Sequence, residues 1–248
     1  MYTYNSGDRF LKKEWWTIRA PGMFALRDFT KSPVNQTQGK KLSKDAMKGR
    51  VYEANFNDLS KDTGVASKKI KFIVEEAEEG SRLAQTNFYG MDTTRDHLCS
   101  LIKKWHTLID VFVDCKTSDG FLLRFFVTCF TARQKQQLKA TTFAQRSQVK
   151  HIRAIIKKCI VSATVRSTLK ELVGKILGDK LPLDMEQKCK KIFPIENCII
   201  RKVKTIKRPR FDITQLMSMQ TDSELAGVEK KKEEEEKKEE NANGNLIQ

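Results

Sequence analysis

Two apolar runs separated by a tight turn constrain the fold of this chain more than any other feature. Residues Thr107–Thr117 and Phe121–Ala132 flank the tripeptide Ser118-Asp119-Gly120. An Asp-Gly step between two apolar runs is a strong hairpin signal. Within the second run, the stretch Phe121–Phe130 is apolar on both faces apart from Arg124 and Thr128, as in a strand that has neighbours on both sides. The sequence therefore predicts a β-hairpin whose second strand lies inside a sheet.

Other short apolar runs bounded by turn residues predict further strands. They are Arg50–Phe56, Lys69–Glu75, Leu83–Tyr89 and Asn197–Ile206. Apolar stripes with helical spacing indicate helices. One stripe follows a capping-box pair, Thr93 and Asp96, and consists of Leu98, Leu101, Ile102 and Trp105. Two more are Leu169, Leu172, Val173, Ile176 and Leu177, ended by Gly178, and Met185, Cys189, Ile192 and Phe193, ended by Pro194.

These elements predict an α+β fold, in which amphipathic helices flank a mixed or antiparallel, barrel-like sheet and a charged C-terminal tail follows. A length of 248 residues is sufficient for a large buried core. We expect an N-terminal extension at residues 1–14 and a single α+β domain at 15–220, in which Asp212 caps a short last helix. Residues 221–248 form the predicted low-complexity tail, because positions 229–240 contain only Lys and Glu.

Positive charge is concentrated in the body of the chain. The sequence has 47 Lys and Arg against 31 Asp and Glu, a net charge of +16. The tail at 221–248 holds five lysines and nine acidic residues, which leaves 42 basic and 22 acidic residues, a net charge of +20, in residues 1–220. A surface of this kind attracts polyanions, of which nucleic acid is the first candidate and anionic lipid the second.

The longest run without a carboxylate lies at Gly120–Lys170, which contains eleven basic residues and no Asp or Glu. Within it we predict a helix at Ala144–Ile160. Its core-facing stripe consists of Val149, Ile152, Ile156, Cys159 and Ile160. Four basic residues fall within about 60° of one another on a neighbouring face and follow each other about 4.5–6 Å apart along the helix axis: Arg146, Lys150, Arg153 and Lys157. This spacing lets each side chain reach a separate phosphate of a nucleic-acid strand.

Two further basic segments extend the predicted RNA-binding site. The loop Thr131–Thr142, just before the helix, contributes Arg133, Lys135 and Lys139. A second cluster consists of Arg201, Lys202, Lys204, Lys207, Arg208 and Arg210, with Phe211 as a candidate stacking ring. Two other interpretations of this cluster remain open, a nuclear-import signal and an exposed edge strand protected by lysine.

The adjacent residues Trp15 and Trp16 point to opposite faces if they lie in a strand. We expect at least one of the two to pack in the core. The alternatives for the other are base stacking and a protein contact.

The motifs of most enzymes and metal sites are missing from the sequence. The six cysteines are at least nine residues apart and there are only three histidines, so no CxxC-type zinc site is formed; we expect reduced, buried thiols in an intracellular protein. Residues 1–10 have no secretory-signal pattern and no apolar run reaches the length of a membrane span. Asp110 and Asp114 share a strand face and leave a metal-dependent nuclease as an alternative. We expect no enzyme activity, no metal and no cofactor.

Several blocks of this sequence resemble one ribosomal protein family. They are Gly49–Glu53 with Asp58-Leu59, Thr86–Asp96, Lys103-Lys104-Trp105, Asp114–Thr117 with Asp119-Gly120, Phe130-Thr131, Phe143-Ala144-Gln145 and Arg201–Lys204. In order and spacing, from about Trp15 to Met217, the chain is similar to the eukaryotic and archaeal small-subunit family eS-one, whose older name is S-three-a. Asn55 and Phe56 depart from its pattern, and the Lys/Glu tail has no counterpart in it.

The resemblance implies a structural protein of the small ribosomal subunit that supports translation. It implies binding to small-subunit rRNA and to neighbouring ribosomal proteins of the platform, near the mRNA exit and with mRNA within reach. The expected location is the cytoplasmic ribosome, after passage through the nucleus and nucleolus during assembly. Neither a membrane nor a small-molecule substrate is expected. The alternatives are an RNA-processing nuclease and a free basic adaptor for RNA or membranes.

Overall fold

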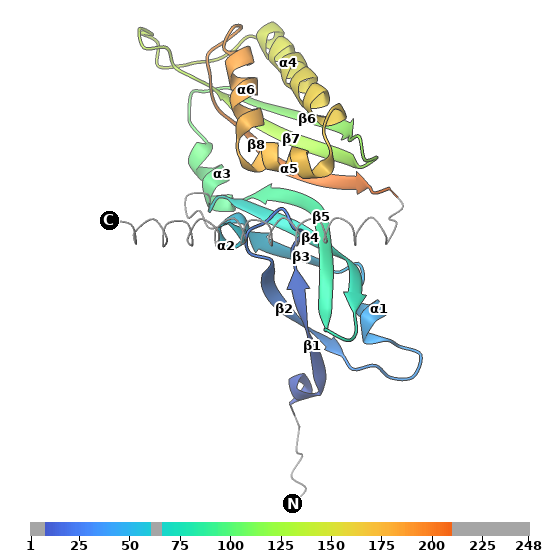
Figure 1. Cartoon of the computed structure of the whole chain (residues 1–248). Helices are drawn as coiled ribbons and strands as arrows, with labels where there is room; N and C mark the ends of the chain where they lie inside the picture. Colours follow the sequence, from blue (N-terminus) through green and yellow to red (C-terminus); the bar gives the residue numbers. More distant parts are fainter. Residues whose placement is uncertain (1–7, 61–65, 210–248) are drawn as a thin grey trace, which may run out of the picture.

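The architecture is known from a computed structural model that describes residues 8–60 and 66–209. These residues form one eight-stranded sheet, in which the strand order is β2-β1-β5-β8-β7-β6 and β4 pairs with both β3 and β5 (Figure 1). The strands are β1 (Lys13–Arg19), β2 (Asp28–Asn35), β3 (Val51–Asn55), β4 (Lys68–Glu78), β5 (Leu83–Thr93), β6 (Leu108–Lys116), β7 (Leu122–Thr131) and β8 (Ile195–Lys207). The helices are α1 (Ser43–Met47), α2 (Phe56–Leu59), α3 (Arg95–Leu101), α4 (Arg146–Val165), α5 (Leu169–Leu177) and α6 (Lys180–Cys189), with a short 3-10 helix at Arg9–Lys12.

The sheet is mixed and open. β1 runs parallel to β5 over three residue pairs, whereas every other pairing is antiparallel. The two ends of the strand order, β2 and β6, are not paired with each other. The predicted α+β class with a mixed sheet is therefore confirmed, and the sheet has free edges where a barrel would close.

The predicted central hairpin is formed by β6 and β7. Its turn contains Gly120, whose φ of +87° is a backbone conformation that glycine adopts without strain. β7 pairs with β6 on one side and with β8 on the other, as its two apolar faces predict. Alternate residues of β6 are buried, which directs Ile109, Val111 and Val113 to one face of the sheet.

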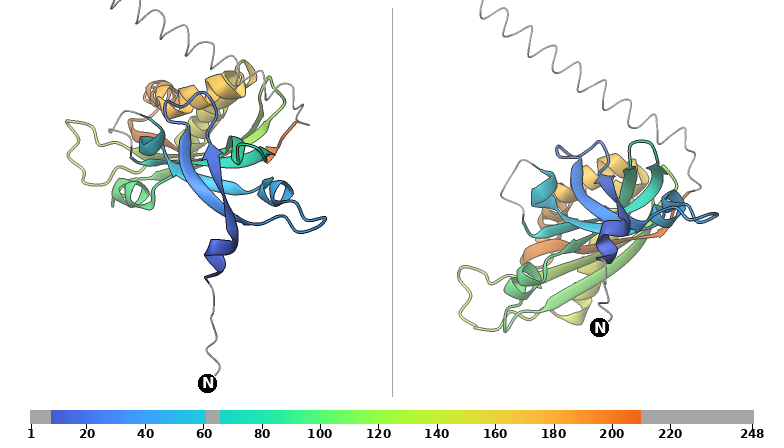
Figure 2. Two further views of the ribbon diagram at one scale, coloured as in Figure 1. Left: turned by 60° about the horizontal axis from the view of Figure 1, so that its bottom comes forward. Right: turned by 90° about the horizontal axis from the view of Figure 1, so that it is seen from below.

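Three helices cover that face. α4, α5 and α6 lie over β6, β7 and β8 and form a second layer (Figures 1 and 2). The main core fills the space between the layers, where the buried strand residues meet Ile152, Ile156 and Ile160 of α4. A smaller core lies in the other half of the molecule and contains Trp16, Ile18, Val34, Met47, Val74, Ala77 and Ala84. Trp16 is therefore a core residue, and Trp15 is exposed, as opposite strand faces require.

A buried lysine joins the helical layer to the sheet. The Lys68 Nζ on β4 donates hydrogen bonds to the carbonyl oxygens of Ile176 and Leu177, at 3.3 and 2.8 Å, and pairs with the Asp179 carboxylate at 2.7 Å. These carbonyl groups lie at the C-terminal end of α5, where backbone acceptors lack partners within the helix and a cation is favourable. Lys68 thus fixes α5 against the sheet.

Three sequence predictions differ from the structure. The predicted helix that starts at Thr93 and runs through Trp105 is shorter in the structure: Thr93 belongs to β5, Thr94 is the N-cap and the helix ends at Leu101. Ile102 and Trp105 are exposed. α6 ends at Cys189, four residues before Phe193. α4 begins at Arg146 and continues five residues beyond Ile160. The predicted helix after Asp212 and the Lys/Glu tail lie outside the described residues, and no helix within the described residues is long and apolar enough to cross a membrane.

Candidate nucleic-acid interface

The four predicted basic residues of α4 form one exposed row, which we call the α4 row. Arg146, Lys150, Arg153 and Lys157 are all exposed, whereas Ile152, Ile156 and Ile160 are buried. The helix starts at a capping box in which the side chains of Gln145 and Gln148 bind each other's backbone N–H groups. The rigid helix therefore holds the row at a constant spacing along its axis.

Most charges of the row are not neutralised within the described residues. Arg146, Lys150 and Arg153 form no ion pair there. Lys157 Nζ lies 5.9 Å from the ring centroid of Phe112 on the edge strand β6, at cation–π distance. This contact places the row on the side of α4 that faces the edge of the sheet.

The basic loop between β7 and α4 is organised by one glutamine. The side-chain Nε2 of Gln137 donates to the carbonyl oxygens of Lys139 and Thr141, at 3.0 and 2.8 Å. The backbone carbonyl oxygen of Gln137 accepts a hydrogen bond from the Arg133 guanidinium at 3.0 Å. Arg133, Lys135 and Lys139 are exposed, and the loop projects from the body in every view (Figures 1 and 2). These side chains are available to a polyanion.

The second basic cluster has a mixed role. Lys202 pairs with Asp92 at 2.9 Å and Arg208 pairs with Glu75 at 2.8 Å, so two of its charges are used within the protein. Lys204 Nζ lies 5.8 Å from the ring centroid of Phe126. Arg201 and Lys207 form no ion pair within the described residues, and Arg210 lies outside them together with Phe211.

Two phenylalanines connect the α4 row to this second cluster. Phe112 and Phe126 are direct cross-strand partners, and Phe126 is in turn paired with Lys202. Their side chains lie on the sheet face opposite α4–α6, because Val111, Val113 and Phe125 occupy the covered face. A continuous strip, Lys157, Phe112, Phe126 and Lys204, thus runs from the helix around the β6 edge onto the open face. We call this strip together with the α4 row the basic surface.

Sequence reasoning missed this connection. The alternation of β6, in which Phe112 shares a face with Asp110 and Asp114, was readable from the sequence. The pairing of β7 with β8, which brings Lys204 to the same face, joins residues far apart in the chain and left no local signal.

The two aspartates of β6 are used as structural partners. Arg124 donates two hydrogen bonds to Asp114, at 2.6 and 2.7 Å, and lowers the pKa of that carboxyl. Thr128 Oγ1 donates to Asp110 at 2.7 Å. No cluster of metal-ligating side chains occurs among the residues that the structure describes.

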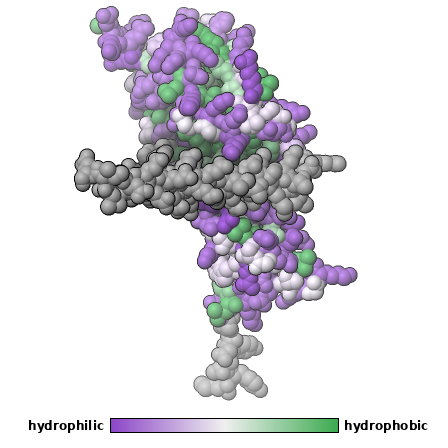
Figure 3. Space-filling model, in the orientation of Figure 1, coloured by the Kyte–Doolittle hydropathy of each residue, from purple (hydrophilic) through white to green (hydrophobic). Residues whose placement is uncertain are grey.

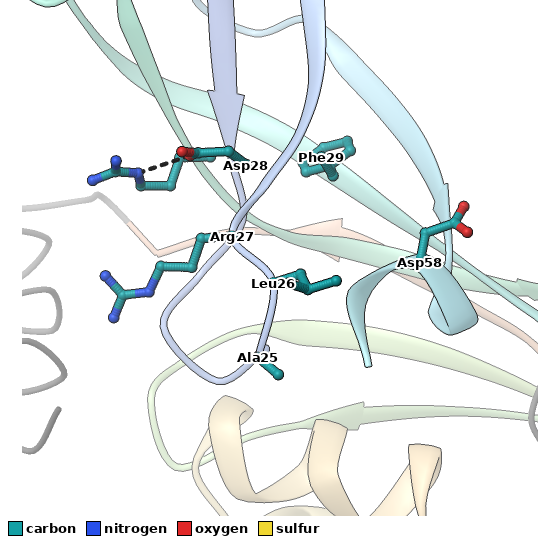
Figure 4. Close-up of a pocket in the computed structure, with 7 residues that line it drawn as sticks. Ala25, Leu26, Arg27, Asp28, Phe29 and Asp58 are labelled. Carbon is teal, nitrogen blue, oxygen red and sulfur yellow. Dashed lines mark hydrogen bonds and ion pairs between the residues drawn. The ribbon is translucent and has the colours of Figure 1, made fainter. Parts of the chain in front are cut away.

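A cavity elsewhere in the fold is lined by charged and apolar side chains. It has a volume of about 700 Å³ and lies between the β1–β2 loop and α2 (Figure 4). Arg19 donates to Asp28 across its wall at 3.1 Å, and Leu26 and Phe29 supply apolar lining. Its two arginines and two aspartates balance in charge. In the upper part of Figure 3, hydrophilic residues lie around a smaller group of hydrophobic ones.

The fold and its surface define a basic α+β protein whose exposed, uncompensated cations gather on α4. The model of one protein family, described as the Ribosomal S3Ae family, matches residues 3–209. The chain belongs to this family and is a ribosomal protein of the small subunit. It is a structural constituent of the ribosome in translation, not an enzyme, and its partners are rRNA and ribosomal proteins. The nuclease alternative is therefore wrong.

Proposed function

We propose that this protein binds small-subunit rRNA through the basic surface. The observation that supports this most directly is the α4 row, in which at least three exposed cations have no carboxylate partner among the described residues. Such cations bind RNA favourably, because they replace the counterions of the phosphates and release them into solution. Arg133, Lys135 and Lys139 in the preceding loop, and Lys207 at the end of β8, extend the contact.

The finer placement of the protein also belongs to this proposal. We infer a position on the platform near the mRNA exit, contact with neighbouring platform proteins and with mRNA, and passage through the nucleolus during assembly. The support is the family resemblance of the sequence blocks at Thr86–Asp96 and Arg201–Lys204. Crosslinking of assembled subunits through residues of α4 tests the contact with rRNA. The proposal requires crosslinks from α4 to small-subunit rRNA, and the crosslinked nucleotides give the position of the protein.

The binding test replaces the α4 row. Changing Arg146, Lys150, Arg153 and Lys157 to Gln removes four positive charges and leaves the buried stripe intact, because Gln is a good helix former. We expect normal thermal unfolding and an affinity for an rRNA fragment about 100-fold lower at moderate salt. Filter binding and thermal melting measure the two effects.

A matched control separates location from total charge. Lys31, Lys40, Lys41 and Lys48 are also exposed, and they lie around β2 and α1, in the half of the molecule remote from α4. Changing these four to Gln removes the same charge. Equal losses of affinity in the two variants would show that only net charge matters and would overturn the assignment of the site to the α4 row.

A further inference from the structure

Trp105 has a left-handed backbone conformation, which is unusual for a large side chain. α3 ends at Leu101, and Trp105 follows with a φ of +66°. A large side chain is strained in this left-handed region, where glycine or asparagine is usual. The indole is nevertheless 61% exposed, so burial does not offset the strain. Strained residues of this kind are concentrated at functional sites.

The backbone around Trp105 is held by a hydrogen-bonded frame. Thr142 N–H donates to the Trp105 carbonyl oxygen at 2.8 Å, and Ala144 N–H donates to Thr107 Oγ1 at 3.1 Å. Thr131 Oγ1 donates to the Thr142 carbonyl oxygen at 2.6 Å. The frame joins the segment after α3 to the end of the basic loop, and it carries a second exposed ring, Phe143, which is 61% exposed.

Both rings are free and lie in a positive environment. Neither Trp105 nor Phe143 makes an aromatic or cation–π contact within the described part of the chain. Lys104, Arg133, Lys135 and Lys139 are exposed nearby in sequence or on the loop that the frame closes. The loop contains no carboxylate, and the adjacent Lys103 is paired with Glu196 at 2.8 Å.

We propose that Trp105 and Phe143 form a stacking site for unpaired RNA bases, whose phosphates are held by the lysines and arginines of the loop. Exposed aromatic faces among uncompensated cations match single-stranded RNA, which offers a base and a phosphate in each nucleotide. The core of a protein interface is instead depleted of lysine. The proposal rests on the proposed RNA-binding function and adds to it a site for bases, distinct from the phosphate contacts of the α4 row.

The first test uses tryptophan fluorescence of the full chain. Trp15→Phe leaves two tryptophans, the exposed Trp105 and the buried Trp16. A single-stranded oligouridylate of about ten nucleotides should quench its emission, because a base stacks on the indole. The same oligonucleotide with abasic sites keeps the phosphates and should not quench. Equal quenching by both oligonucleotides would overturn the proposal.

The second test separates the ring from the fold. Trp105→Gly suits the positive φ and removes the ring, so the protein should fold normally and bind oligouridylate about tenfold more weakly with an unchanged salt dependence. Trp105→Phe should recover part of the loss. The control is Leu138→Ala, because Leu138 is a 98% exposed aliphatic residue of the same loop and cannot stack; its affinity should stay at the parent's value.

An RNA duplex of about twenty base pairs, which offers phosphates without unpaired bases, distinguishes the two proposals. The parent and Trp105→Gly should bind it equally, whereas the α4-row variant should bind it weakly. If Trp105→Gly binds oligouridylate like the parent, or Leu138→Ala loses as much, the stacking site is refuted and the exposed patch is a protein contact. If the parent binds neither RNA, the proposed function and the stacking site both fail.

Discussion

Gly90 on β5 lies where no other residue fits. A Cβ atom at this position would stand 2.6 Å from the Val203 carbonyl oxygen of β8, well inside the contact distance of real Cβ atoms. β5 and β8 are joined by only three residue pairs, including Gly90 with Lys204. The absent side chain therefore permits the pairing that connects the two halves of the sheet.

We expect Gly90→Ala to destabilise the protein by about 1–3 kcal/mol, because backbone must move to accommodate the methyl group. Gly174 in α5 is the matched control, since nothing lies within 4 Å of its would-be Cβ; Gly174→Ala should stabilise the helix by up to about 1 kcal/mol. Urea unfolding of both variants measures the difference. Equal stabilities would contradict the close approach of β5 and β8.

The six thiols differ in environment. Cys99 is exposed and Cys159 half-buried, whereas Cys115, Cys129, Cys189 and Cys198 are buried. Burial raises the pKa of Cys189 to about 12. A hydrogen bond to Cys198, with Sγ atoms 2.9 Å apart, raises the pKa of Cys129. The thiols of Cys129 and Cys189 are therefore protonated at neutral pH and poor nucleophiles.

With a thiol reagent at pH 8 we expect fast reaction at Cys99, slower reaction at Cys159, and reaction at the other four only on unfolding. Because the folded pKa of Cys189 lies above its ordinary value of 9.0, the stability that its protonated form contributes is complete below pH 9 and is lost as the pH rises toward 12. Mass spectrometry after timed labelling gives the order of reaction. Early labelling of Cys189 would refute the buried environment.

Among the elements, α4 was the most predictable. Its apolar stripe and its basic row are both local patterns, and the structure buries the three isoleucines of the stripe and exposes the basic row. α3 was less predictable, because a stripe through Ile102 and Trp105 satisfies helical spacing, yet their exposed side chains provide no burial to extend the helix. The β1–β2 hairpin was not predicted; Pro33 in β2 is a poor strand signal that an edge strand tolerates.

Changing Ile152 or Ile156 to Ala should cost about 2–5 kcal/mol at each site, because both side chains are fully buried between α4 and the sheet. The effect on RNA binding should follow only from unfolding, the reverse of the α4-row variant. Thermal melting and filter binding on the same preparation distinguish the two. If an alanine variant melts like the parent, α4 does not seal the core as the structure shows.

For the whole molecule, the net charge of +20 in residues 1–220 predicts strongly salt-dependent binding. If the α4 row and the second cluster together engage about eight phosphates, the logarithm of the binding constant should fall with the logarithm of salt concentration at a slope of about −6 to −7. Titrations of an rRNA fragment at several salt concentrations give the slope. A slope near −1 is incompatible with the basic surface as the site of contact.

At this scale the sequence was least informative. Alternation predicted the fold class and strands β3 to β8, and composition indicated the basic residues of the candidate site. The strand order was not, because β1 pairs in parallel with β5 and β5 with β8 across long stretches of chain. The ion pairs that occupy Lys202 and Arg208 depend on that order, since Asp92 and Glu75 lie on other strands.

The position of β8 has a consequence for how the protein is made. It is the last described strand in the chain, yet it lies between β5 and β7 in the sheet. Until Ile195–Lys207 has been synthesised, β5 and β7 each have an unpaired edge where β8 will lie. Unpaired strand edges are sites of aggregation in nascent chains. The native sheet is therefore completed only after β8 has been made, and a chain cut short before Ile195 leaves β5 and β7 without the strand that joins them.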